Sequence, residues 1–180
     1  VWLTIVGIAV LLAGSWLWPV TSIGDRWIDI RVYRGAVDWM LAGHDLYSFA
    51  IPDINGPVTF LYPPFAAVLA IPATWLSLGA EITAWTVSQI AMSGLLVWLL
   101  LRDAAGAGRW VGRSLLVPVA AWALFAFSGP VLIGLNLGQV SLFVTTLAVA
   151  DVLLLPPKWR GSLIGIAGAI KLTPLFFIAF

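Results

Sequence analysis

The sequence predicts an all-α integral membrane protein: a polytopic bundle of transmembrane helices, interrupted near its start by one charged segment that faces water. The first observation is composition, because 62% of the 180 residues are hydrophobic and only 9% are charged. An ordinary soluble domain is about 45–50% apolar and about 25% charged. A chain this short leaves much of its surface in contact with solvent, so we expect that solvent to be largely lipid. The other observations are a series of apolar runs and the gathering of charge between them.

The first apolar run covers residues 1–20 and carries no charge. At about 1.5 Å per residue it reaches roughly 30 Å, the thickness of the hydrocarbon layer, so we predict a membrane helix here. The chain opens at Val1 inside this run and stops at Phe180 inside another. We therefore expect residues 1–180 to be the N-terminal part of a single polytopic membrane domain, truncated at both ends.

Residues 21–62 differ from the rest of the chain because they hold five of the eight acidic residues and the only histidine. Within this segment, charged and apolar side chains separate onto two sides at helical spacing, which is typical of an amphipathic helix. The charged side carries Arg31, Arg34 and Asp38, and the apolar side carries Val32, Ala36, Val37 and Met40. We predict a short interfacial helix that ends at Gly43 and lies along the membrane surface, in the first extracytoplasmic loop.

Five further apolar runs follow the loop and predict further membrane segments. They cover residues 64–79, 81–101, 114–132, 139–155 and 162–180. The first is short and contains Pro72, so we expect it to be kinked or re-entrant. Basic residues gather in the connectors after the second and fourth of these runs, and the positive-inside rule places both connectors in the cytoplasm and the 21–62 loop outside. This orientation requires a single net crossing between residues 64 and 101.

Composition also argues against several classes of protein. The net charge is +1 and the nine basic residues are scattered, which excludes a nucleic-acid-binding surface. One histidine and no cysteine argue against a zinc site. The sequence contains no glycine-rich nucleotide-binding loop and no Gly-x-Ser-x-Gly motif, so the common nucleotide and hydrolase sites are not predicted. We predict no metal and no cofactor.

Two ionisable residues lie inside the later apolar runs, where a charge facing lipid is costly and suggests a function. Lys171 lies deep in the last run, and two interpretations remain open. It faces a cavity that accepts an anionic group such as a phosphate, or it pairs with a carboxylate or extends its ammonium group to the interface. Asp151 lies about one turn before the end of the preceding run, and for it we favour a structural role.

Asp29 lies where the chain leaves the first membrane helix, just before the amphipathic helix. A carboxylate at this boundary is within reach of a lipid-borne donor and of a polar acceptor. It can take a proton from an attacking hydroxyl group if it lies within hydrogen-bonding distance. Aspartate is also a common cap at the start of a helix. The spacing of the residues leaves both interpretations open.

Five segments resemble one enzyme family in order and spacing. They are Asp-Ile-Arg-Val-Tyr-Arg at 29–34, Leu-Ala-Gly-His-Asp-Leu-Tyr at 41–47, Thr-Phe-Leu-Tyr-Pro-Pro-Phe at 59–65, Gly-Gln-Val at 138–140 and Ala-Ile-Lys-Leu-Thr-Pro at 169–174. The family is that of the polyprenyl-phosphate-mannose-dependent alpha-mannosyltransferases of actinobacteria, glycosyltransferase family eighty-seven, in the C-type superfamily of membrane glycosyltransferases. Relatives commonly have asparagine after Gly-Gln-Val, where this chain has Ser141.

The resemblance implies a C-type glycosyltransferase fold and an inverting, metal-independent transfer of mannose, with Asp29 as the catalytic base. The donor would be polyprenyl-phosphate mannose, and the acceptor a cell-envelope glycolipid or lipoglycan. The enzyme would be a multi-pass protein of the plasma membrane, with its active site on the extracytoplasmic face. The residues expected to contact substrate are Tyr33, Arg34, Tyr47, Tyr62, Gln139 and Lys171.

Within this hypothesis, Arg34 or Lys171 balances the phosphate charge, and arginine is the better bidentate donor. The three tyrosines are neighbours of the sugar or of the lipid headgroup, although anchoring at the interface explains a tyrosine equally well. Two other functions stay open. One is a polytopic transporter with Lys171 and Asp151 lining its pathway, and the other is a non-catalytic membrane scaffold.

Overall fold

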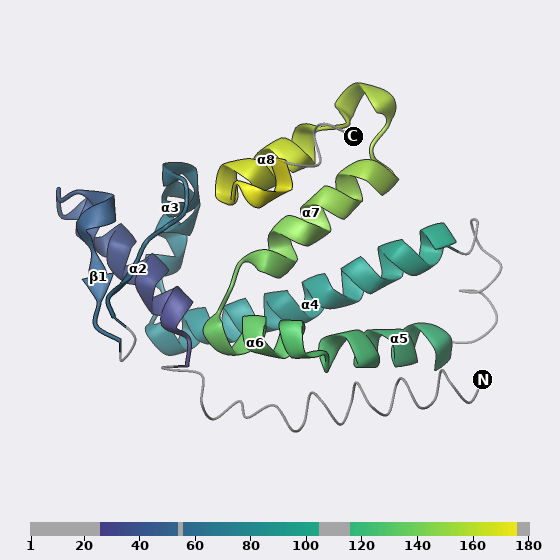
Figure 1. Cartoon of the computed structure of the whole chain (residues 1–180), viewed down its shortest axis with the longest axis horizontal. Helices are drawn as coiled ribbons and strands as arrows, with labels where there is room; N and C mark the ends of the chain where they lie inside the picture. The colour runs from purple at the N-terminus through teal and green to yellow at the C-terminus, as the bar shows by residue number, and fades with distance from the viewer. Residues whose placement is uncertain (1–25, 54–55, 105–115, 176–180) are drawn as a thin grey trace.

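A computed structural model describes residues 26–53, 56–104 and 116–175 (Figure 1). The described part is mostly helical, as predicted, with one two-stranded hairpin. The membrane helix predicted at residues 1–20 lies outside the described residues.

The amphipathic helix predicted in the charged segment is present as α2, Ile28–Leu41. Val32, Ala36 and Val37 of its predicted apolar side are buried, together with Ile28, Ile30 and Tyr33. The helix ends as expected near Gly43, which has a φ angle of +89°, and whose N–H donates a hydrogen bond to the C=O of Met40. A left-handed glycine closes a helix in this way without the steric cost that a side chain adds.

The segment after α2 is a compact loop. A turn of 3₁₀ helix, η2 (Leu46–Ser48), leads into two short antiparallel strands, β1 (Ala50–Ile51) and β2 (Val58–Thr59), with Ala50 opposite Thr59. The loop then brings Phe60 into the core, where it is almost fully buried beside Tyr33.

The run at 64–79 is broken, as its proline predicts. It forms helix α3 (Pro64–Ala70) and the 3₁₀ turn η3 (Ile71–Trp75), with Pro72 in the first turn of η3. Helix α4 (Leu78–Ala104) follows. Among the described residues, α4 alone is long and apolar enough as a single helix to cross a membrane.

The later runs form shorter helices than predicted. The run at 114–132 becomes α5 (Leu116–Ala126) and part of α6 (Gly129–Leu137), which are bent by 60° and together are long and apolar enough for a second crossing. Helix α7 (Ser141–Leu154) leads through the turn η4 (Pro157–Trp159) to α8 (Ser162–Ile170). The described helices therefore offer one or two membrane crossings by length and composition.

The predicted continuation of the last helix through Lys171 is wrong. Helix α8 ends at Ile170, and Lys171 adopts an extended backbone with φ −147° and ψ 127°. Pro174 lies four residues after Ile170 and has no N–H to donate to the C=O of Ile170, so the helix cannot continue. Lys171 consequently stands at a helix end.

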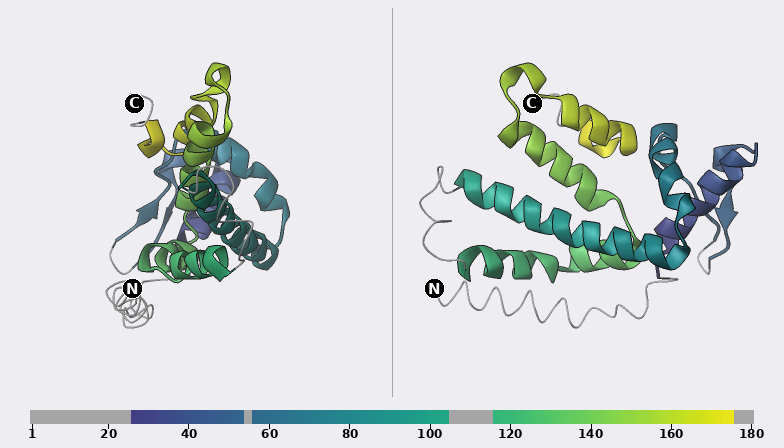
Figure 2. Two further views of the ribbon diagram at one scale, coloured as in Figure 1. Left: turned by 90° about the vertical axis from the view of Figure 1, so that its right-hand side faces the viewer. Right: turned by 180° about the vertical axis from the view of Figure 1, so that it is seen from behind.

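The helices run back and forth between two ends of the molecule. Helix α4 packs against α5 and α7, and α7 packs against α8, as the views in Figure 2 show from two further sides. Helices α2 and α3 lie together at the end where α4 begins and α6 ends. This end brings together segments that are far apart in the sequence, and the buried core there includes Tyr33, Phe60, Val140 and Ala167.

Candidate active site

Asp29 lies in the first turn of α2, one residue inside the helix rather than at its cap. The cap position belongs to Trp27, which has a left-handed φ of 64° and provides no side-chain cap. The N–H of Trp27 instead donates to the C=O of Asn136 at 2.8 Å. The start of α2 is therefore held by the corner between α6 and α7, and the Asp29 carboxylate does not have to cap the helix.

Partial burial raises the pKa of Asp29 from 3.8 to about 6, although the positive charge of Lys171 pulls it back down. Burial acts in this direction because it disfavours the charged form of a carboxyl group. A base whose pKa lies close to the pH at which it works combines a useful basicity with a large deprotonated fraction. Asp29 is thus ionised at neutral pH and basic enough to accept a proton.

Two tyrosines face each other beside this carboxylate. The hydroxyl of Tyr33 donates to the hydroxyl of Tyr62 at 3.0 Å, and their rings meet edge to face with centroids 5.2 Å apart. Burial, with the charge of Asp29 as a further cause, raises the pKa of both tyrosines above the ordinary value of 10.0. Both phenols are therefore neutral. Tyr47 supports the pair, because its hydroxyl donates to the C=O of Tyr62 at 3.1 Å.

Lys171 reaches the same site from the end of α8. Its ammonium group donates to the hydroxyl of Ser141 at 3.2 Å and lies 5.7 Å from the centre of the Tyr62 ring. Ser141 in turn donates to Oε1 of Gln139 at 3.3 Å. The predicted residues Asp29, Lys171 and Gln139 therefore meet at one site, and Ser141 connects the last two.

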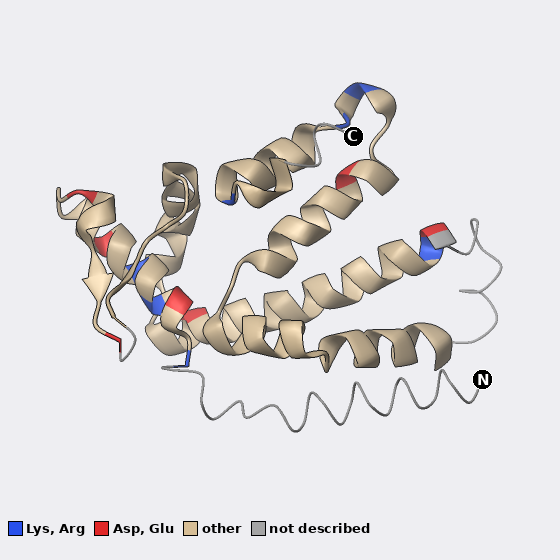
Figure 3. Ribbon diagram, in the orientation of Figure 1, with Lys and Arg blue, Asp and Glu red and all other residues tan. Residues whose placement is uncertain are grey.

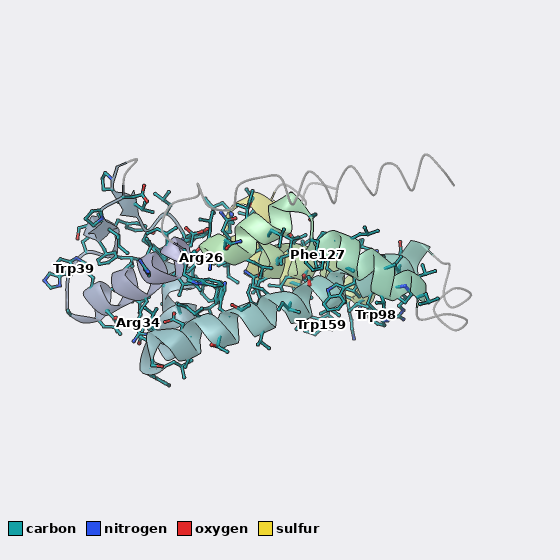
Figure 4. The ribbon with its side chains drawn as sticks, turned by 90° about the horizontal axis from the view of Figure 1, so that it is seen from below. Arg26, Arg34, Trp39, Trp98, Phe127 and Trp159 are labelled. Atoms are coloured by element: carbon teal, nitrogen blue, oxygen red, sulfur yellow. The ribbon has the colours of Figure 1, made fainter. Side chains whose placement is uncertain are left out.

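Arg34 points away from this group and lies between α2 and α4 (Figure 4). Its guanidinium donates to Oε2 of Glu81 at 2.8 Å, and to the C=O groups of Thr74 and Leu76 at 3.0 and 2.9 Å. These bonds join α2 to η3 and to the first turn of α4. Of the two cations considered for the phosphate, Lys171 is the one that faces Asp29.

An apolar cavity of about 260 Å³ opens beside the tyrosine pair. Its walls come from α2, α3, α4, α7 and α8. The residues that line it include Tyr33, Tyr62, Glu81, Trp85, Val140 and Ile170. A carboxylate, a cation and an apolar cavity thus lie close to one another. This arrangement fits a ligand with a charged part and an apolar part. Within the described residues, no three His, Cys, Asp or Glu side chains are close enough to hold a metal ion.

The model of glycosyltransferase family 87 matches residues 60–180, more than half of the chain. The chain belongs to glycosyltransferase family 87. The matched region contains Tyr62, Gln139 and Lys171, whereas Asp29 and the rest of α2 precede it.

Similarity to individual family 87 proteins extends over almost the whole chain. A Mycobacterium tuberculosis protein named polyprenol-phosphate-mannose-dependent alpha-(1-2)-phosphatidylinositol mannoside mannosyltransferase is 30% identical, with 94% of this chain and 44% of the relative covered. A protein of the same name from Mycolicibacterium smegmatis is 34% identical, with 85% of this chain and 38% of the relative covered. A Mycolicibacterium smegmatis protein named for a phosphatidylinositol pentamannoside is 32% identical, with 93% and 40% covered. The chain thus spans about two fifths of the length of these curated relatives, and no solved structure matches it.

Two buried polar residues close to the candidate site were missed by the sequence analysis. Glu81 is buried as the partner of Arg34, and Gln89 is buried where α4 meets the α6–α7 corner. A signal was present for Glu81, because a carboxylate next to an apolar run needs a partner. For Gln89 the only signal was an amide group in the middle of an apolar run.

Asp151 has the structural role favoured from the sequence. Its side chain is 1% exposed and accepts hydrogen bonds from the N–H groups of Gly161, Leu163 and Ile164 at 2.6, 2.7 and 3.3 Å. These bonds satisfy the first turn of α8, whose other end is followed by Lys171. The carboxylate of Asp151 is thus bound by backbone donors at the start of α8 and not by Lys171.

Proposed function

We propose that this protein is a membrane glycosyltransferase that moves mannose from a polyprenyl-phosphate donor to a cell-envelope glycolipid or lipoglycan, with inversion at the anomeric carbon. The observation that carries the proposal is Asp29, a partly buried carboxylate whose pKa burial raises to about 6 while Lys171 opposes the shift. Names of the relatives support the donor, since they specify polyprenol-phosphate mannose, and the acceptor class, since they specify phosphatidylinositol mannosides.

In the proposed reaction, Asp29 takes the proton of the acceptor hydroxyl group. The hydroxyl oxygen forms a bond to the anomeric carbon from the side opposite the phosphate. The bond from that carbon to the phosphate oxygen breaks, and its electron pair leaves with the polyprenyl phosphate. Alignment of the two substrates contributes roughly 7–11 kcal/mol at best, and general-base assistance adds about 10²–10⁴-fold.

The ammonium group of Lys171 balances the charge of the departing phosphate. It is held by Ser141 and by the face of Tyr62, so it is ordered before the substrate arrives. Tyr33 and Tyr62 are neutral donors next to the same point. They donate hydrogen bonds to the sugar or the phosphate. Gln139, whose Oε1 accepts from Ser141, contributes its Nε2 group as a further donor.

We infer that the chain is part of one polytopic membrane domain with this site on the extracytoplasmic face of the plasma membrane. Basic residues lie in the turn between α7 and α8 and, beside an acidic residue, at the far end of α4, whereas acidic and basic residues both gather around α2 at the other end (Figure 3). The positive-inside rule, applied to the basic connectors at 102–113 and 156–161, then places the α2 end outside. The short α3–η3 pair, followed by the long α4, supports the single net crossing between residues 64 and 101 that this orientation requires.

Replacement of the proposed base tests the function directly. In membranes that contain the protein, Asp29→Asn is expected to reduce transfer of labelled mannose from polyprenyl-phosphate mannose by about 10²–10⁴-fold, because the carboxamide cannot accept the proton. The matched control is Asp45→Asn, which changes an exposed aspartate of the same loop and leaves the rate unchanged. Wild-type transfer by Asp29→Asn, in membranes that hold equal amounts of both variants, would remove Asp29 from the catalytic role.

A further inference from the structure

Gln89 is a polar side chain in the middle of the longest apolar helix. It is 1% exposed, and its Nε2 donates a hydrogen bond to the backbone C=O of Gln139. Its Oε1 is buried and has no hydrogen-bond partner within the described part of the chain. A buried amide group with one open position costs free energy. A leucine or methionine at this position would stabilise the helix packing better. The role of Gln89 therefore lies in its hydrogen bond to Gln139 and in the segment that this bond holds.

The bond holds the corner between α6 and α7. Gly138 has a φ of +79°, and an added Cβ there would lie 2.5 Å from Cγ1 of Ile30. The corner is therefore in van der Waals contact with the first turn of α2. It also accepts the N–H of Trp27 through the C=O of Asn136 at 2.8 Å. The corner thus fixes the first turn of α2, in which Asp29 lies.

The same corner also holds the cation. The side chain of Gln139 accepts the hydroxyl of Ser141, and Ser141 accepts the ammonium group of Lys171. Both sides of the Asp29–Lys171 pair are consequently attached to residues 136–141. That segment is joined to α4 through Gln89.

We propose that Gln89 is a positioning residue that sets the distance between Asp29 and Lys171 by holding the α6–α7 corner against α4. This inference rests on the proposed function. In this inference Gln89, which lies outside the reacting centre, keeps Asp29 and Lys171 at the separation that the reaction needs. A displacement of about 1 Å between groups that act together can lower a rate by roughly 100-fold.

The test is Gln89→Met, which keeps the length of the side chain and removes the donor. We expect kcat for mannose transfer to fall by roughly 10- to 100-fold with little change in KM, since the corner loses its tie to α4. The pH profile gives a second readout. Lys171 after α8 lowers the pKa of Asp29, and the other titratable groups beside Asp29 are Tyr33 on α2 and Tyr62 before α3, whose pKa values Asp29 helps to raise. When Lys171 moves away, the pKa of Asp29 rises, and the acid limb of the profile moves to higher pH.

Ser93→Ala is the matched control, because Ser93 is another buried polar residue of α4 and accepts a hydrogen bond from Trp122, away from the site. It is expected to leave the pH profile unchanged. Ser141→Ala cuts the connection between the corner and Lys171 without touching α4, and should move the acid limb in the same direction as Gln89→Met. This second variant keeps the test decisive if Gln89→Met does not fold.

A wild-type kcat and pH profile in Gln89→Met would overturn the inference, as would an equal shift in Ser93→Ala. If Gln89→Met does not fold, an unmoved acid limb in Ser141→Ala overturns it instead. The failure of the inference is distinguishable from that of the proposed function. Loss of activity in Asp29→Asn together with a normal Gln89→Met refutes only the positioning role. Absence of mannose transfer by the wild-type protein refutes the function itself, and full activity in Asp29→Asn removes the proposed base.

Discussion

Two carboxylates, Asp151 and Asp29, have opposite surroundings near the two ends of the described part of the molecule: Asp151 is buried, whereas Asp29 is partly buried. Asp151, between α7 and α8, accepts three backbone N–H groups within 3.3 Å. Partial burial raises the pKa of Asp29, at the start of α2, to about 6, and the positive charge of Lys171 opposes this rise. The carboxylate of Asp151 accepts hydrogen bonds from backbone N–H groups at the start of the next helix. The carboxylate of Asp29 is partly buried at a site that residues distant in the sequence form together.

The difference distinguishes a carboxylate with a structural role from the carboxylate that we propose as the base. Backbone N–H groups at a helix start favour an ionised carboxylate and hold it in place. Burial without such donors makes a carboxylate a stronger base. An ionisable residue in an apolar run is therefore a clue to function only after its hydrogen-bond partners are known.

The largest expected effect is on stability, at Asp151. Asp151→Ala should lower the free energy of unfolding by about 3 kcal/mol or more, because each buried N–H left without a partner costs about 1–3 kcal/mol. Asp29→Asn should leave the stability almost unchanged, since the amide removes a charge that burial already disfavours. Thermal unfolding of the detergent-solubilised variants, followed by circular dichroism, measures both. Equal losses in the two variants would contradict the distinction between them.

Local features of the α2 end could be read from the sequence, because they depend on neighbours a few residues apart. The spacing of Val32, Ala36 and Val37 predicts which face of α2 is buried, and a glycine predicts where the helix ends. The clustering of Tyr62, Gln139 and Lys171 near Asp29 was expected only through the resemblance to a family. No periodicity in one sequence encodes a contact across 30 or more residues.

The same limit explains what the sequence analysis missed. Arg34 was one of two cations considered for the phosphate, and the sequence did not reveal that its guanidinium donates to Glu81, which lies 47 residues away. Likewise, the apolar character of residues 162–180 hid the end of α8 at Ile170. Apolar composition predicts burial or membrane contact, while hydrogen-bonding capacity decides where a helix ends and which charges pair.

The next effect concerns the cation at the Asp29 end. Lys171→Met should lower kcat/KM by roughly 10- to 150-fold at pH 8, since a hydrogen bond to a charged group contributes about 1.5–3 kcal/mol. The acid limb gives the second readout. In the proposed mechanism transfer requires ionised Asp29, so the wild-type rate is expected to fall as the pH drops through about 6.

The positive charge of Lys171 lowers the pKa of Asp29. Loss of that charge should therefore raise this pKa and move the acid limb to higher pH. Rates measured from pH 5 to 9 at saturating and limiting donor follow both effects. Lys158→Met, at an exposed lysine of the η4 turn, is the control. A limb that stays in place in Lys171→Met would show that the two side chains do not interact.

The smallest expected difference lies between two left-handed glycines, one at each end. Gly138 has φ +79° and Gly161 has φ +93°, but an added Cβ at Gly138 meets Ile30 at 2.5 Å, whereas no atom lies within 4 Å of one at Gly161. Both Gly→Ala variants pay for the left-handed backbone, about 1 kcal/mol. Gly138→Ala should lose a further 1–2 kcal/mol or so through overpacking.

Thermal inactivation of the two alanine variants measures this difference in stability. The transfer rate shows whether the substitution also displaces the residues of the candidate site. In Gly138→Ala the clash pushes the first turn of α2, so the rate per folded molecule should fall as well. In Gly161→Ala the N–H that binds Asp151 lies far from the reacting groups, and activity should follow the amount of folded protein alone. The double variant Gly138→Ala/Ile30→Ala removes the clash but keeps the backbone strain. It should recover the rate more fully than the stability, because the clash with Ile30 is what displaces the first turn of α2, which carries Asp29.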